Sequence, residues 1–161
     1  MTEYHLKNRA NREIISDSEI NDILLKGKFT VISMCRDNEP YIVTLSYGFD
    51  AKKNSLYVHC APQGLKIDFI KSNPRICATV IEDGGYIADE CGHNYRTVVF
   101  WGEMHFEEDL EEKKHGMGIL LNHLEKNGQV IQEKLLKSDD YYSKMEMLRI
   151  DIKQIHAKAG R

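Results

Sequence analysis

The sequence predicts a mainly antiparallel β-barrel with helices covering its ends. Six segments show the alternating or β-branched apolar pattern of strands, and they lie at 29–35, 41–49, 55–60, 75–82, 95–106 and 147–155. Polar turns join most of them, and a single short helix, expected at 64–72, separates the third strand from the fourth. A parallel sheet would need a crossover between every pair of neighbouring strands, so antiparallel pairing is favoured.

The N-terminal half is expected to begin with a helix over 16–26. Ser16 is placed to cap this helix, Glu19 follows three residues later as in a capping box, and Gly27 comes after its end. The polar stretch 36–40 predicts the turn between the first two strands. In the second strand, one face carries the residues Tyr41, Val43, Leu45, Tyr47 and Phe49, and the other carries Ile42, Thr44, Ser46 and Gly48.

The C-terminal half adds two long strands and more helix. Residues 83–94 are expected to form a long loop between the fourth and fifth strands. A helix rich in Glu, Lys and Leu is expected over 107–126, with Gly128 as its stop, and a second helix or turn over 129–137. The last strand alternates apolar with charged residues, which predicts that it is half-buried.

Composition limits the functions that the chain can have. Its 161 residues suit one domain, and the net charge of −3 gives no basic field to hold nucleic acid. No apolar run approaches the length of a membrane helix, and the N-terminus lacks an apolar signal region, so a cytoplasmic protein is expected. The four cysteines, Cys35, Cys60, Cys77 and Cys91, form no C-x-x-C pair. They are expected to be free thiols, and no metal site is expected.

The segment 59–66 carries the first sign of a ligand. It leaves a strand, turns at Pro62 and Gly64, and opens a helix at Leu65. The first amides of a helix are unsatisfied and suit a phosphate, whereas the helix dipole disfavours a cation such as Lys66 there. An anion between the helix and Lys66 would explain this placement. A surface lysine is the alternative.

Two further features have open interpretations. Arg96 stands in an apolar strand, where its guanidinium suits a phosphate or carboxylate, or forms a cross-strand ion pair. Trp101 suits the core or a dimer interface. The polar face of the second strand, at Thr44 and Ser46, would let a planar ligand approach the backbone, or would face water.

Ordered motifs resemble a known family. NRANREI, LYVHCAPQGLKIDFIKSNPRICATV and YRTVVFWGE are similar to motifs of the FMN-binding split-barrel flavoproteins related to pyridoxamine 5′-phosphate oxidase, and most closely to the nitroimidazole-resistance branch. The resemblance is detailed over 11–106 and extends in element order to residue 155. It implies a six-stranded antiparallel split β-barrel with peripheral helices, forming a single FMN-binding domain over 1–161 with its core at about 11–155.

The resemblance also implies site residues. Strand backbone would line the flavin ring, and Lys66 would bind the FMN phosphate. The positions expected to bind FMN are Val43, Thr44, Leu45, Ser46, His59, Cys60, Ala61, Lys66, Arg96, Thr97 and Trp101. Leu65 replaces the first residue of the Arg-Lys pair of pyridoxamine phosphate oxidases, and the C-terminus lacks their substrate-binding segment, so vitamin B6 oxidation is not expected.

The predicted function is an FMN-dependent oxidoreductase that reduces nitroaromatic or quinone-like compounds, with a nicotinamide or another carrier as electron donor. A flavin- or haem-binding protein without turnover is the alternative, and His59, His93 and His105 keep haem open. A homodimer with flavin at its interface is expected, using the apolar strand around Val99, Phe100 and Trp101. His59 would donate protons, or would only form a hydrogen bond.

Overall fold

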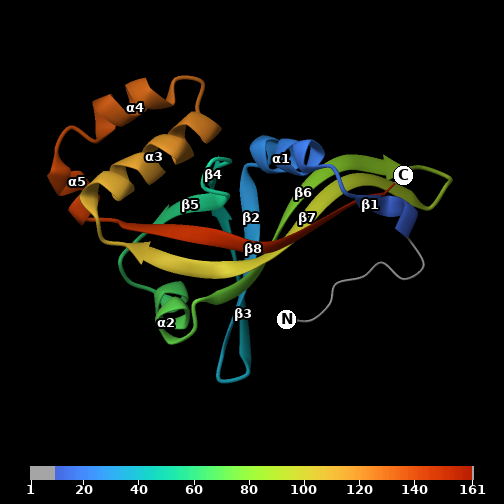
Figure 1. Ribbon diagram of the computed structural model, residues 1–161, viewed down its shortest axis with the longest axis horizontal. Helices are drawn as coiled ribbons and strands as arrows, with labels where there is room; N and C mark the ends of the chain where they lie inside the picture. The colour runs from blue at the N-terminus through green and yellow to red at the C-terminus, as the bar shows by residue number, and fades with distance from the viewer. Residues whose placement is uncertain (1–9, 161) are drawn as a thin grey trace.

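The computed structural model describes residues 10–160 as one sheet surrounded by helices (Figure 1). The strands are β1 (Glu13–Ile14), β2 (Phe29–Arg36), β3 (Glu39–Ser46), β4 (Gly48–Asp50), β5 (Ser55–Cys60), β6 (Arg75–Ile87), β7 (Gly92–Glu107) and β8 (Glu146–Gly160). The helices are the 3-10 helix η1 (Ala10–Arg12) and the α-helices α1 (Asp17–Lys26), α2 (Leu65–Ser72), α3 (Leu110–Leu124), α4 (Gly128–Leu135) and α5 (Asp139–Ser143).

All strand pairs are antiparallel, in the order β3-β2-β6-β7-β8-β5-β4, with β1 added beside the end of β8. The antiparallel class and the peripheral helices are therefore confirmed. The predicted number of six strands was wrong, because the sheet formed by residues 10–160 has eight. One addition is the short strand β1. The other arises because the expected strand 41–49 is divided at Tyr47.

Tyr47 is the single residue between β3 and β4, the two end strands of the sheet. Its side chain is fully buried, its hydroxyl donates a hydrogen bond of 2.6 Å to the Leu24 carbonyl, and its ring centre lies 4.9 Å from that of His123. These contacts hold the bend in the chain between α1 and α3. Tyr47 alone connects these two end strands, and no ladder joins them in the described structure.

The prediction of a long loop over 83–94 was also wrong. β6 continues to Ile87 and β7 begins at Gly92, so these residues form the end of a long β6–β7 hairpin, called the hairpin arm below. The pair Gly84-Gly85 suggested a loop, but a register shift between Asp83 and Tyr86 accommodates it within the ladder. Since β8 ends opposite Tyr95, the strands of the arm beyond this point pair only with each other.

Side chains alternate between two faces of the sheet. The inner face forms the main core, and Phe100 lies there with no exposed surface, so the expectation that it belongs to a dimer surface conflicts with its position. On the outer face, α3, α4 and α5 cover the β5 end through a second cluster that includes Tyr57 and Met147. Among residues 10–160, no helix is long and apolar enough to cross a membrane.

Candidate functional site

β3 and α2 lie at the bottom of the view in Figure 1, and the chain reaches α2 from the end of β5. The rings of Tyr41 on β3 and Phe69 on α2 have their centres 5.0 Å apart, and the guanidinium carbon of Arg36 lies 4.5 Å from the Phe69 ring centre. The Asn73 amide donates a hydrogen bond of 2.9 Å to the Cys35 carbonyl. These contacts fix α2 against the β2–β3 hairpin.

The second edge of β3 is available to a ligand. In the described part of the chain, β3 forms a ladder with β2 alone. The side chains of Val43 and Leu45 pack against the core, whereas Thr44 and Ser46 alternate to the outer face. Contacts of Val43 and Leu45 with a ligand at this edge would therefore use backbone N–H and carbonyl groups, as the resemblance implies.

The predicted residues at the end of β5 divide between the two faces. Cys60 packs against the main core, and burial raises the pKa of its thiol. His59 is exposed on the opposite face of the strand, and Ala61 is exposed in the turn that follows. Although the His59 ring is open to solvent on one side, the surrounding chain desolvates it and lowers its pKa, so the neutral imidazole is favoured at pH 7.

The N-terminus of α2 has free hydrogen-bond donors. Gly64 caps the helix without a side-chain bond, with a φ of 133° that favours glycine, and a Cβ there would meet nothing within 4 Å. The Gly64 carbonyl accepts bonds from the amides of Ile67 and Asp68. The preceding amides of Leu65 and Lys66 lie in the first turn, where a helix supplies no acceptor.

Lys66 stands at this open end without a counter-ion. It is half-buried, and no carboxylate within the described residues forms an ion pair with its ammonium group. An ammonium, two helix amides and an open space before the helix together suit a phosphate dianion. The residues present therefore fit the phosphate group that the sequence predicts here.

Arg96 is positioned differently. Its guanidinium forms ion pairs with Glu82 on β6, with Asp22 at 2.7 Å and with Glu19 at 3.5 Å, both on α1. The hydrogen bond with Asp22 raises the pKa of Arg96 further, so it stays charged. The cross-strand ion pair that the sequence left open is thus present, and Arg96 connects α1 to the sheet.

Thr97 and Trp101 lie on the outer face of β7, where Thr97 is almost fully buried and donates a hydrogen bond of 2.9 Å to the Val80 carbonyl. The order β3-β2-β6-β7 places β7 three strands from β3. Neighbouring strands are about 4.8 Å apart, so this separation is about 14 Å. Most of the predicted residues therefore lie on β3, at the end of β5 and at the start of α2, whereas Arg96, Thr97 and Trp101 lie on β7.

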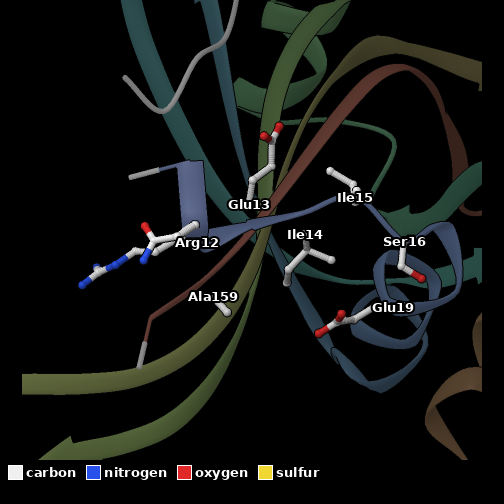
Figure 2. A pocket seen from close by; sticks show the side chains of 8 residues that line it. Arg12, Glu13, Ile14, Ile15, Ser16, Glu19 and Ala159 are labelled. Carbon is white, nitrogen blue, oxygen red and sulfur yellow. The ribbon is translucent and has the colours of Figure 1, made fainter. Parts of the chain in front are cut away.

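A hollow of about 430 Å³ lies where β1 meets α1, and it includes part of the N-terminal motif (Figure 2). Arg12 stands at one end and Ser16 with Glu19 at the other. No predicted FMN-binding residue lines it, and Glu19 already forms an ion pair with Arg96. This hollow is therefore separate from the candidate site.

A family model described as pyridoxamine 5′-phosphate oxidase matches residues 16–159. The chain belongs to this family. The predicted family is thus confirmed, over nearly the whole of the described chain.

Individual relatives are more distant. An uncharacterized protein of Rhizobium meliloti (strain 1021) is 33% identical over 69 residues, which are 43% of this chain and 44% of that protein, so the match spans less than half of either. A candidate 5-nitroimidazole antibiotic resistance protein from Bacteroides thetaiotaomicron has a TM-score of 0.79 at 22% identity, covering 92% of this chain and 86% of the other. The flavocytochrome Anf3 from Azotobacter vinelandii has a TM-score of 0.80 at 16% identity, and the match covers 96% of this chain and 72% of the other. At these identities the structures share the fold.

The contacts of Arg96 predict a mainly structural effect of its replacement. Arg96→Gln leaves Glu82 and Glu19 without this cation, while Asp22 keeps its ion pair with Lys26 at 2.9 Å. We expect a loss of about 1–2 kcal/mol in the free energy of unfolding, because solvent weakens each pair. Urea denaturation measures this loss. Arg75→Gln, at an exposed position on β6, is the control and should change little. Equal stability of the two variants would contradict the role of Arg96 as a connection between α1 and the sheet.

Proposed function

We propose that this protein is an FMN-binding oxidoreductase that reduces nitroaromatic or quinone-like compounds, with a nicotinamide dinucleotide as electron donor. The observation that carries the proposal is Lys66 at the open N-terminus of α2, which forms no ion pair within the described residues. Lys66 and the first amides of α2 would hold the phosphate. The backbone from Val43 to Ser46 would bond the polar edge of the flavin ring.

His59 would carry out the proton transfer that accompanies electron transfer by the flavin. Bound FMN would supply two-electron transfer between donor and acceptor. His59 lies on the outer face at the end of β5, the face that Thr44 and Ser46 also share. Its neutral imidazole can take up a proton from solvent and release it to a reduced acceptor. The proposal thus gives phosphate binding to α2, ring binding to β3 and proton transfer to His59.

We also propose a homodimer, formed through the outer face that no helix covers. Phe29 and Ile42 are 62% and 64% exposed there, and Val99 and Trp101 lie half-buried on the same face. Exposed apolar side chains on a sheet face that no helix covers suit an interface. Because Thr97 is about 14 Å from β3 of its own chain, a two-fold axis offers a way for it to approach flavin held by the partner.

The first test concerns the phosphate. Lys66→Ala removes a charged hydrogen bond of about 1.5–3 kcal/mol, so FMN affinity should fall about ten- to a hundred-fold, as measured by quenching of flavin fluorescence. Lys71→Ala, on the exposed last turn of the same helix, is the matched control and should bind FMN as the wild type does. Riboflavin lacks the phosphate, so its affinity should be unchanged by Lys66→Ala. Unchanged FMN affinity in Lys66→Ala would overturn the assignment.

The second test separates the two roles of His59. His59→Gln keeps a hydrogen-bonding group but cannot ionise. The variant should therefore bind FMN normally, and its turnover rate should fall by a factor of about 10²–10⁴. Burial lowers the pKa of His59, so little of the imidazole is protonated at pH 7. The protonated fraction, which is the proton donor, increases as the pH falls. Wild-type turnover should therefore rise from pH 7 to pH 5.5, and that of His59→Gln should not. Normal turnover of the variant would leave His59 as a hydrogen-bonding residue only.

The third test concerns assembly. Light scattering at micromolar concentration should give the mass of a dimer for the wild type. Ile42→Glu puts a charge on the uncovered face and should give a folded monomer with weakened FMN binding. Leu135→Glu, on the exposed surface of α4, is the control and should remain dimeric. A flavin-loaded wild-type monomer would refute the proposed interface.

A further inference from the structure

A second hollow, of about 360 Å³, is lined by residues of α2, the end of β7, the start of α3 and the start of β8. In Figure 1 the end of β7 lies above α2, and the chain rises from there into α3. Ligand pockets begin at about this size and combine apolar walls with a few polar groups. No residue expected to bind FMN lines this hollow.

One side of the hollow is apolar. It is formed by Pro62 in the turn before α2, Ile67 on α2 and Phe106 near the end of β7. Ile67 is buried, and Phe106 packs against the main core, so both side chains are held in place. Lys71 follows Ile67 by one helical turn, and its ammonium lies 5.9 Å from the Phe106 ring centre. A fixed aromatic and aliphatic wall therefore adjoins a positive charge.

The charged groups of the hollow do not satisfy one another. Glu107 already has a partner, because its carboxylate forms an ion pair of 2.9 Å with Arg149. Four other charged residues line the hollow and form no ion pair within residues 10–160, and they are Lys71, Lys113, Glu108 and Glu146. Lys113 and Glu146 are half-buried, so water compensates their charges only in part. The hollow therefore presents two unpaired charges of each sign.

We infer that this hollow binds an apolar α-amino acid as its zwitterion. A simple anion would be repelled by the two unpaired carboxylates, and a simple cation by the two unpaired ammonium groups, whereas a zwitterion offers a partner to both. The ligand carboxylate pairs with Lys113 and the ligand ammonium with Glu146. Its side chain packs against Ile67 and Phe106. The inference goes beyond the proposed function, because it requires no flavin.

Calorimetry on the full-length protein with L-phenylalanine tests the inference, and two analogues each lack one charge. Hydrocinnamate lacks the ammonium group, and phenethylamine lacks the carboxylate. The wild type should bind L-phenylalanine about ten-fold or more tightly than either analogue, because only the amino acid satisfies both signs of charge. Added salt should weaken its binding.

Two variants separate the two charges. Lys113→Gln should weaken binding of L-phenylalanine and hydrocinnamate about ten-fold, and should not weaken that of phenethylamine. Glu146→Gln should weaken binding of L-phenylalanine and phenethylamine, and should not weaken that of hydrocinnamate. Lys126→Gln and Glu125→Gln change exposed residues just beyond the other end of α3, so these matched controls should bind all three compounds as the wild type does.

The opposite selectivity of the two variants is the decisive result, and circular dichroism reports whether each keeps the fold. The inference is overturned if the wild type does not bind L-phenylalanine, or if both variants bind it unchanged. It is also overturned if each variant weakens all three compounds alike, since a purely structural role would have that effect. None of these outcomes involves FMN affinity, so they are distinguishable from failure of the proposed flavin site.

Discussion

The bend of the chain at Tyr47 is the constraint on which the rest of the structure depends. β3 and β4 are consecutive in the chain and stand at the two ends of the sheet, and no ladder joins them in the described structure. Instead, one buried residue joins the two strands, held by a hydrogen bond to the Leu24 carbonyl and by the ring of His123. The second edge of β3 is left without a strand partner in the described chain. A ligand can bind at this edge without breaking any ladder.

The two cations that the sequence singled out differ in how far they are satisfied. Arg96 is surrounded by three carboxylates, so its charge already stabilises the packing of α1 on the sheet. Lys66 has no such partner in the part of the chain that the structure describes, and it stands where helix amides are also unsatisfied. Because an unsatisfied cation retains its capacity to bind an anion, Lys66 is the stronger candidate for a phosphate ligand.

Local sequence signals predicted the parts of the fold that depend on local pattern. The alternation in β3 placed Val43 and Leu45 on one face, which the structure packs against the core, and the turn at Gly64 correctly began α2. Gly84-Gly85 predicted a loop where the structure has a bulge, since a bulge in a long hairpin and a loop have the same local composition. The partners of Arg96 could not be predicted either, because Asp22 lies 74 residues away on a helix whose docking depends on the whole sheet.

The structure of the protein with FMN bound tests the central claim most directly. The account predicts the phosphate at the N-terminus of α2, within hydrogen-bonding distance of the Lys66 ammonium and the Leu65 and Lys66 amides. It also predicts the flavin ring along the free edge of β3. A phosphate bound at Arg96, with the ion pairs to Asp22 and Glu82 broken and Lys66 facing only solvent, would contradict it.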